Sequence, residues 1–476
     1  MDVVIDRRPL WVIILVKGFR YFLLAVLAFA TYTAARQTPP EGLTEEGLKA
    51  IAVFGLSLVL WVTHLLPLAI TGLLAIVLIA LFGVMTSSEV YALFGNEAVF
   101  FILGALILAS GILKTGLSSR LALIVLNLFG SSSRALVTGI FLTSAFLSFW
   151  MPEHAVAAMM FPIVLEIARG LDLKPLKSNY GKALFISLAW GSITGGVATF
   201  LGGARNPLAI AILNETSGLT IGFFEWMITV VPIVLALLAV GYMLISVVLR
   251  GGSEEIGRAR KLIAEKKIKL GRVTYEEYMV GIIMVVTIFL WMFFSHSIGL
   301  ANIAILSVVA LFVFKLVTWK DVELYVNWGI ILMYGGAICL GTAITKSGAA
   351  LWAGESLIGS SVSSPFAMIV VFAILALFLT ECVSNTAIVA ILLPLGISIS
   401  KSFGIDPKVM TYAVAVPAGF AFILPMGTPP TAIALSSGYL KLRDLILYGL
   451  VLKFAVVVIF LLMAKYYWPI IGIHII

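Results

Sequence analysis

Apolar segments of about 20 residues recur along the chain from Leu10 to the C-terminus, with polar stretches between them. A helix of that length and composition crosses the hydrocarbon core of a bilayer. The pattern predicts about eleven transmembrane spans, at roughly residues 10–34, 48–66, 67–84, 97–114, 181–216, 223–249, 277–295, 299–317, 327–345, 408–437 and 445–465. Two more apolar segments, near residues 135–170 and 365–402, are expected to enter and leave the membrane on one side.

Composition supports an all-α polytopic membrane protein. The 476 residues are 62% hydrophobic and 11% charged, with a mean hydropathy of +1.14, whereas a soluble domain carries about 25% charged residues. The two cysteines, Cys339 and Cys382, lie inside apolar segments and lack metal-ligand spacing. Neither a disulfide nor a zinc site is indicated.

The distribution of basic residues predicts the orientation. With the N-terminus inside, 23 of the 31 Lys and Arg residues fall on the cytoplasmic side, as the positive-inside rule requires. We therefore expect a multi-pass protein of the plasma or inner membrane, with a cytoplasmic N-terminus, an external C-terminus and an uncleaved first span. The net charge of +8 is then an orientation signal, and no nucleic-acid partner is expected.

The two halves of the sequence repeat each other at an offset of 232 positions. This offset places "GALILASGILKTG" (104–116) on "GAICLGTAITKSG" (336–348), and "MPEHAVAAMMFP" (151–162) on "VSNTAIVAILLP" (383–394). Each repeat has an odd number of crossings, so the repeats are expected to be inverted. The predicted organisation is an N-terminal span and loop (1–47), repeat 1 (48–250), a basic cytoplasmic linker (251–276) and repeat 2 (277–476).

Polar residues interrupt the apolar segment near 365–402. Ser384, Asn385 and Thr386 are helix N-cap residue types directly before an apolar helix, which predicts the tip of a re-entrant hairpin. Free backbone N–H groups at such a tip suit an anion, and hydroxyl and amide oxygens suit a small cation. Ordinary capping at a loop is the alternative.

Two predicted spans contain helix-breaking residues. Gly427, Pro429 and Pro430 interrupt the span at 408–437, and "GGARNP" (202–207) interrupts the span at 181–216. Non-helical backbone at membrane depth is tolerated only inside protein or beside a water-filled cavity. Two broken helices and two hairpin tips, related by the repeat, predict one central site of the kind that secondary transporters use. A simple kink is the alternative for each helix alone.

The motifs "SNTA" (384–387) and "GTPPT" (427–431), with similar placement in two halves, resemble the divalent anion/sodium symporter family. The resemblance covers essentially the whole chain. It implies a homodimeric elevator-type transporter, in which a scaffold holds a moving domain that binds a dicarboxylate, tricarboxylate or sulfate beside sodium. Carried over by position, it implies substrate contacts from Asn385, Thr386, Thr428 and Pro429, and a sodium site made by Thr380, Ser384, Asn385 and Gly427.

The first half departs from the family pattern. Pro152, Glu153 and His154 stand where the family repeats its serine-asparagine-threonine tip, and "GGARN" (202–206) stands where it has a second Gly-Thr-Pro-Pro. Proline supplies no side-chain ligand, which leaves Ser148 and Gly202 as the remaining oxygen donors of a first sodium site.

An unpaired Glu153 beside an anion site would repel the substrate and be costly to bury. Arg205 has no neighbouring acid in sequence, so we expect a Glu153–Arg205 pair across the site, with the titratable His154 beside it. The predicted substrate contacts of this half are Glu153, His154, Arg205 and Asn206. The alternative is that Pro152 and Glu153 only reflect the preference for these residue types at a helix start.

Other intramembrane charges carry weaker predictions. Glu381 precedes the hairpin tip and either orients it or fills a hydrogen-bonded packing role. Glu97 and Lys114 lie at span ends, where snorkelling is expected. Lys453 lies in the last span, and the sequence assigns it no partner.

The sequence thus predicts a secondary active transporter of small divalent anions, with four-carbon dicarboxylates ahead of citrate and sulfate. Sodium at one retained site, protons, or both would couple transport; no organic cofactor is expected, and the partners are the anion, the bilayer and a second copy of the chain. A sodium-independent exchanger and a cation/proton antiporter using Glu153 are the alternatives. An enzyme is not expected, because "PEHAV" (152–156) lacks the second histidine of a metallohydrolase motif.

Overall fold

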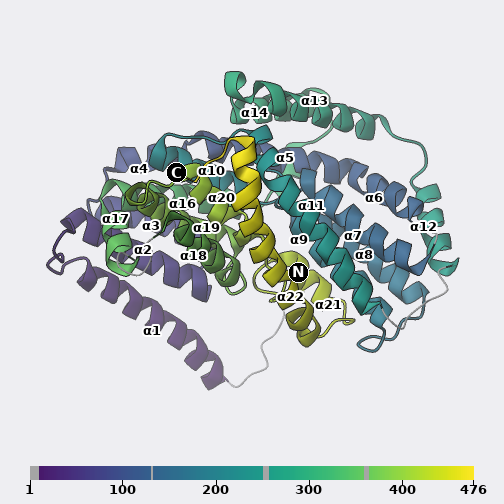
Figure 1. The fold of residues 1–476 in the computed structure, drawn as a ribbon, viewed down its shortest axis with the longest axis horizontal. Coiled ribbons are helices and arrows are strands. Elements are labelled where there is room, and N and C mark those ends of the chain that lie inside the picture. The colour runs from purple at the N-terminus through teal and green to yellow at the C-terminus, as the bar shows by residue number, and fades with distance from the viewer. Residues whose placement is uncertain (1–9, 130–131, 250–256, 359–363, 476) are drawn as a thin grey trace.

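The computed structural model describes residues 10–129, 132–249, 257–358 and 364–475, and these form helices without any β-strand (Figure 1). The helices of the first half are α1 (Leu10–Ala34), α2 (Glu45–Thr63), α3 (Leu68–Leu81), α4 (Ser87–Phe94), α5 (Glu97–Thr115), α6 (Leu117–Leu128), α7 (Ser133–Trp150), α8 (Glu153–Gly170), α9 (Asn179–Gly195), α10 (Arg205–Ser217) and α11 (Phe223–Val248). The remaining helices are α12 (Gly257–Lys269), α13 (Tyr275–Ile298), α14 (Leu300–Val313), α15 (Trp319–Tyr325), α16 (Trp328–Lys346), α17 (Ala349–Ile358), α18 (Pro365–Leu379), α19 (Asn385–Ser402), α20 (Pro407–Ala415), η1 (Pro417–Gly419), α21 (Pro429–Ser436), α22 (Leu442–Leu462), η2 (Met463–Tyr467) and η3 (Trp468–Ile471).

Local sequence explains where many of these helices begin. A Ser, Thr, Asn or Asp side chain at the N-cap accepts a backbone N–H of the first turn in helices α2, α4, α5, α7, α9, α13, α15, α18 and α20. Each such bond satisfies a donor that has no partner within the helix.

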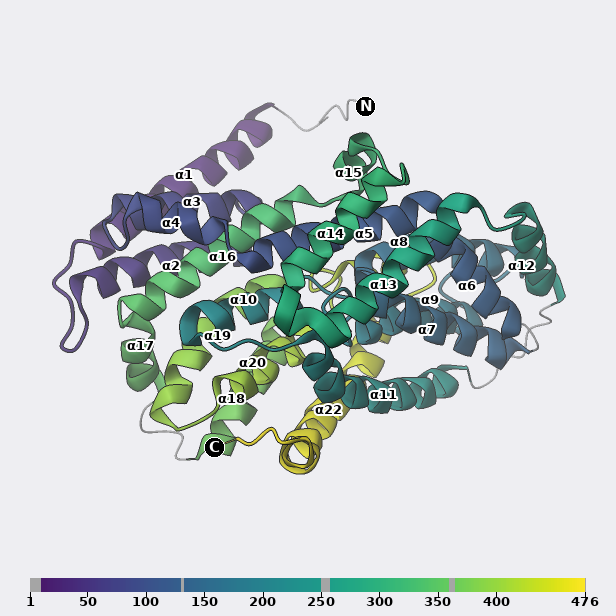
Figure 2. The same ribbon diagram turned by 90° about the horizontal axis from the view of Figure 1, so that it is seen from above.

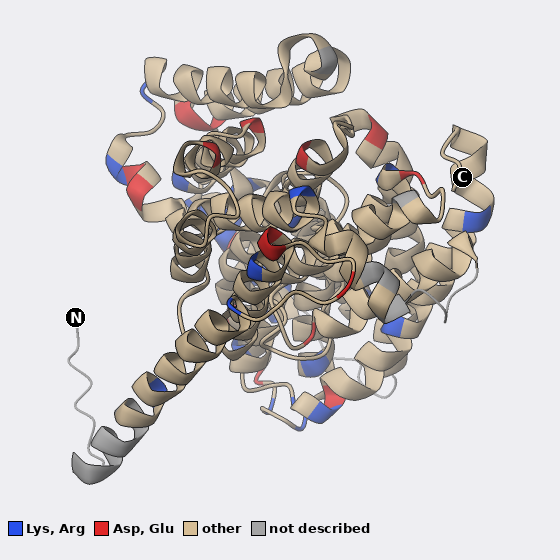
Figure 3. Cartoon of the chain, turned by 90° about the vertical axis from the view of Figure 1, so that its left-hand side faces the viewer, with Lys and Arg blue, Asp and Glu red and all other residues tan. Residues whose placement is uncertain are grey.

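Within the described residues, seven helical stretches are long and apolar enough to cross a membrane. Some predicted spans are shorter helices: α3 and α14 have 14 residues each, which is about 21 Å at 1.5 Å per residue and less than the hydrocarbon thickness. The segments predicted at 67–84 and 299–317 therefore include non-helical residues at their ends. Figure 3 shows that charged residues are sparse on the helices of this apolar body.

The predicted interruptions are present in the structure. Helices α7 and α8 are separated only by Met151 and Pro152, and residues 380–384 separate α18 from α19. The other two breaks lie between α9 and α10, at residues 196–204, and between α20 and α21, where η1 is the one short helical turn. Each of the four predicted segments thus contains two helices with a break between them.

The repeat is also visible in the helix boundaries. The pairs α3 and α14, α4 and α15, α7 and α18, and α8 and α19 begin 232 positions apart. Packing is reciprocal, because α3 of the first half contacts α16, while α14 of the second half contacts α5. Figure 2 shows α5, α13 and α14 crossing the middle of the molecule, with α1–α4 toward one end of its long axis and α6, α7 and α12 toward the other.

Candidate functional site

The two hairpin tips and the two helix breaks line one cavity of about 400 Å³. All the predicted substrate residues except Asn206 line it: Glu153, His154, Arg205, Asn385, Thr386, Thr428 and Pro429. Its opposite wall comes from residues 67–69 and from 327, 329, 330 and 333, near the starts of α3 and α16. Sequence reasoning did not identify this wall, because its residues are mostly apolar and carry no motif.

Four helices begin at the cavity, and their first residues line it. They are α8 at Glu153, α10 at Arg205, α19 at Asn385 and α21 at Pro429. The N-terminus of a helix presents unpaired N–H groups and the positive end of the helix dipole. Convergence of these ends favours an anion in the cavity.

Glu153 and Arg205 form the predicted ion pair. Arg205 Nη1 lies 3.2 Å from Glu153 Oε2, and both residues are buried, with exposed fractions of 2% for Arg205 and 5% for Glu153. Thr428 Oγ1 donates to Glu153 Oε1 at 2.9 Å, so a residue of the second half supports the pair. The Glu153 backbone N–H donates to Gly202 O at 2.9 Å and joins the hairpin to the break in the same half.

Two glycines make room for the Arg205 guanidinium. A Cβ at Gly203 would lie 2.5 Å from Nη1, and a Cβ at Gly419 would lie 2.5 Å from Nε. Contacts that short do not occur, so only glycine fits at either position while the guanidinium keeps this place. The two glycines come from the two helix breaks, which explains part of the need for non-helical backbone at this depth.

Asn385 stands at the repeat equivalent of Glu153, 232 positions later, and faces the same guanidinium. When the amide is oriented so that both its oxygen and its nitrogen have hydrogen-bond partners, the oxygen accepts from Arg205 Nη1 at 3.2 Å. Its nitrogen then donates to Gly427 O at 3.1 Å and to Thr380 Oγ1 at 2.7 Å. Arg205 is therefore bound from both hairpin tips.

The residues of the predicted sodium site lie together in the second half. Thr380 Oγ1 also lies 2.8 Å from Ala418 O, and Ser384 Oγ accepts the Ala387 N–H at 3.3 Å. A Cβ at Gly427 would lie 2.7 Å from Thr380 O, so the glycine keeps the space beside this carbonyl open. Backbone carbonyl, hydroxyl and amide oxygens are suitable ligands for a small hard cation.

The first half preserves part of the same arrangement. Gly202 packs against the Ser148 carbonyl, and the buried Ser148 hydroxyl has no hydrogen-bond partner among the described residues. Asn206, in contrast, does not line the cavity, because its Nδ2 donates to Thr199 O at 2.7 Å and to Gly196 O at 3.2 Å. Its position fits a role in holding the helix break rather than the predicted substrate contact.

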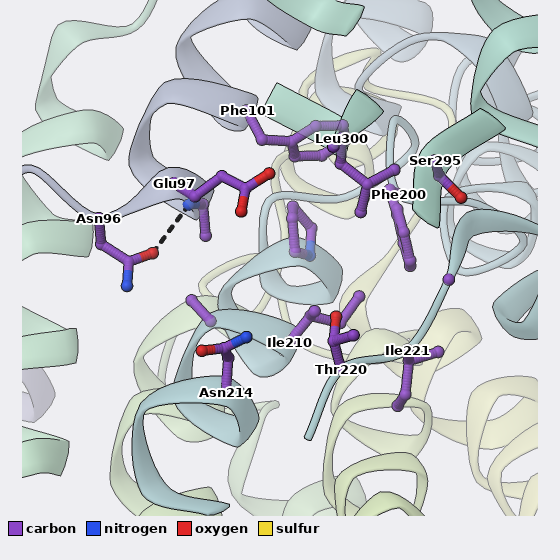
Figure 4. A pocket seen from close by; sticks show the side chains of 15 residues that line it. Asn96, Glu97, Phe101, Phe200, Ile210, Asn214, Thr220, Ile221, Ser295 and Leu300 are labelled. Atoms are coloured by element: carbon purple, nitrogen blue, oxygen red, sulfur yellow. Dashed lines mark hydrogen bonds between the residues drawn. The ribbon is translucent and has the colours of Figure 1, made fainter. Parts of the chain in front are cut away.

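A second cavity, of about 260 Å³, lies between α5, α10 and the start of α14 (Figure 4). Its lining residues from α5 and from the start of α14 include Glu97, Ala98, Phe101, Gly299 and Leu300. At the sequence offset of 232 positions between the two halves, these residues correspond to Gly329, Ile330, Met333, Pro67 and Leu68 of the first cavity. A small pocket that contacts Phe200, Pro207 and His154 lies between the two.

Three of the remaining intramembrane charges form ion pairs, and Glu97 accepts a backbone hydrogen bond. Glu381 accepts the Leu424 N–H at 2.6 Å and lies 2.9 Å from Lys453 Nζ, which supplies the partner that the sequence did not assign. Lys114 Nζ lies 2.6 Å from Asp321 Oδ2, so the predicted snorkelling end carries an ion pair. Glu97 Oε1 accepts from Ala301 N at 3.5 Å, at the start of α14.

Comparison with known proteins gives matches along nearly the full length. The model of the sodium:sulfate symporter transmembrane region matches residues 19–474. Proteins named sodium-dependent dicarboxylate transporter SdcS, from Staphylococcus saprophyticus and Staphylococcus aureus, are 29% and 30% identical over 488 and 483 residues. The matches cover 97% and 96% of this chain and 92% and 91% of those proteins.

A solved structure, that of Neisseria gonorrhoeae MtrF, described as illuminating a class of antimetabolite efflux pumps, has a TM-score of 0.56 to this chain. The sequences are 12% identical, and the alignment covers 94% of each chain. At this identity the likeness concerns the fold alone.

Proposed function

Because the chain belongs to the family of the sodium:sulfate symporter transmembrane region, we propose that it is a sodium-coupled transporter of small dicarboxylates. The observation that carries the proposal is the cavity in which Arg205 and four helix N-termini converge. These groups favour a dianion over a neutral solute or a cation. The names of the staphylococcal relatives, sodium-dependent dicarboxylate transporters, support the same class.

Four-carbon dicarboxylates are the proposed substrates, ahead of citrate and sulfate. The test is thermal stabilisation of the purified protein by succinate, malate, fumarate, citrate and sulfate, followed by uptake of radiolabelled succinate into proteoliposomes. Succinate, malate and fumarate should stabilise the protein and compete with each other for uptake. If none of the five anions stabilises the protein or enters the liposomes, the proposal fails.

Sodium is proposed to bind in the second half, at Thr380, Ser384, Asn385 and Gly427. Binding would turn the Asn385 amide over from the orientation described above, so that its oxygen, which can accept from Thr380 Oγ1 at 2.7 Å, faces the ion while Gly427 keeps the backbone open beside it. In the first half, the Arg205 guanidinium, held by Glu153, is proposed to face the anion as a fixed cation in place of a second mobile one. Arginine keeps its charge when buried. The presence of Arg205 in place of a first sodium ion also favours one alternative, a sodium-independent exchanger. In such an exchanger, fixed positive charge would replace both sodium ions.

The proposed movement is of elevator type. Hairpins α7–α8 and α18–α19, with the broken helices, would carry the anion past a scaffold that includes α3, α5, α14 and α16. The support is the repeated cavity wall, since equivalent residues of α5 and α16 line the second and the first cavity. The proposal also includes a homodimer, with the N-terminus of each chain in the cytoplasm and the C-terminus outside. It includes no catalytic reaction.

A further inference from the structure

Lys453 is a buried cation outside the substrate cavity. It lies in α22, and its side chain is 0% exposed. Its Nζ donates to the Leu377 carbonyl and lies 2.9 Å from Glu381 Oε1 and 5.2 Å from the centre of the Phe378 ring. All three partners belong to the end of α18 or the residues directly after it, so Lys453 fixes this end of the second hairpin to the last long helix.

Glu381 extends this connection to the second helix break. Its carboxylate accepts the backbone N–H of Ile423 at 3.2 Å and that of Leu424 at 2.6 Å. Gly427 follows three residues after Leu424, and its N–H donates to Leu424 O at 3.2 Å. Thr380, on the other side, directly precedes Glu381. One carboxylate therefore joins the two chain segments that bring Thr380 and Gly427 together.

The first half joins its hairpin to its helix break without an ion pair at the equivalent position. The repeat equivalent of Glu381 is Phe149, 232 positions earlier, and its carbonyl accepts from the Thr199 hydroxyl in the same half. The Lys453–Glu381 pair thus occurs in the half that keeps the sodium-type oxygens, and not in the half that carries Arg205. A packing role alone would not require this asymmetry.

We propose that the Lys453–Glu381 pair is the positioning device of the proposed sodium site, holding the tip of α18–α19 and the 423–427 segment at the separation that sodium requires. The inference rests on the proposed function, because it assigns a role toward that site. Groups that orient the ligands of a metal ion typically change its affinity about 10–100-fold when they are removed.

The test uses the purified full-length protein and measures the sodium concentration that gives half-maximal thermal stabilisation. Lys453→Met should raise this concentration at least about tenfold, while the KM for succinate at saturating sodium stays unchanged. Lys182→Met is the matched control, because Lys182 forms a 2.9 Å pair with Asp444, also on α22, but does not touch the hairpin tip.

Lys453→Met leaves Glu381 buried without its cation and will also lower stability. The double variant Lys453→Met with Glu381→Gln removes both charges, so it should recover thermal stability while its sodium requirement stays raised. Wild-type sodium binding in the double variant would overturn the positioning role. Absence of sodium stabilisation in the wild type would instead count against the proposed sodium site itself.

Discussion

At the scale of single residues, a carboxylate beside an anion site needs a compensating charge. Glu153 pairs with Arg205 and accepts from Thr428, so both carboxylate oxygens are engaged, whereas Arg205 Nε and Nη2 have no hydrogen-bond partner among the described residues. Asn385, the repeat equivalent of Glu153, contacts the same Arg205 nitrogen in its satisfied orientation. The two tips thus share one cation, an arrangement that neither tip sequence shows alone.

A double-mutant cycle tests the pair. Arg205→Ala should lower the free energy of unfolding by about 3–5 kcal/mol and abolish succinate binding, because Glu153 is left as an uncompensated buried charge. Arg205→Ala combined with Glu153→Ala should recover stability but not tight binding. Thermal and chemical denaturation of the four proteins measures the coupling, and strictly additive effects would show that the two charges do not interact.

At the scale of elements, the structure shows repeated features that the comparison of the two sequence halves did not show. Capping boxes occur at Thr86–Glu89 and Thr318–Asp321, 232 positions apart. Each acidic residue also pairs with a lysine at the end of a long helix of the other half: Lys346 with Glu89, at 3.8 Å, and Lys114 with Asp321, at 2.6 Å. The two ion pairs therefore cross-link the halves reciprocally.

Asp321, in the short helix α15 outside the spans, carries a pH prediction. The hydrogen bond from Lys114, and then those from Thr318, lower the pKa of Asp321 to about 2. A lowered pKa stabilises the fold above the unfolded value near 3.9, and this contribution is lost as pH falls toward 2. Asp321→Asn should therefore lower the melting temperature at neutral pH, with a difference from wild type that shrinks below about pH 4.

Glu323→Gln is the control for that measurement, because Glu323 is exposed on the same helix. It should leave the melting temperature unchanged across the same range of pH. A difference between wild type and Asp321→Asn that is constant from neutral to acid pH would show that the Asp321 charge does not act in this way.

Sequence alone predicts the hairpins, the breaks and the Glu153–Arg205 pair, because a charge or a helix breaker in an apolar segment must find a partner or line a cavity. It cannot place Lys453 against Glu381, since these residues are 72 positions apart and no repeat relates them. Nor does it identify Gly419, whose need for glycine arises only when Arg205 folds against it from the other half. The predicted substrate contact of Asn206 stays a prediction: its Nδ2 is bonded within the break, while its buried Oδ1 has no hydrogen-bond partner among the described residues.

At the scale of the whole molecule, the proposed elevator movement predicts a relation between the two cavities. Ile330 lines the first cavity together with His154, and their repeat equivalents, at 232 positions, are Ala98 and Thr386. If the repeats exchange roles when the moving domain shifts, Ala98 should approach Thr386 in the opposite state.

Cysteine cross-linking tests this exchange. In a Cys382→Ser background, Ile330→Cys with His154→Cys should cross-link in the state described here. Ala98→Cys with Thr386→Cys should cross-link only in protein that has moved to the other state, so its yield should rise as that of the first pair falls. Equal yields that do not respond to sodium or succinate would argue against a moving domain.

The central claim is that one sodium, bound in the second half, drives dicarboxylate uptake beside a fixed arginine. The most direct measurement is initial succinate uptake into proteoliposomes as a function of external sodium, for wild type and Asn385→Ala. The account predicts sodium-dependent uptake with a Hill coefficient of about one, and loss of the sodium response in Asn385→Ala. Uptake that is the same with and without sodium, and is driven only by internal dicarboxylate, would contradict the account and identify an exchanger.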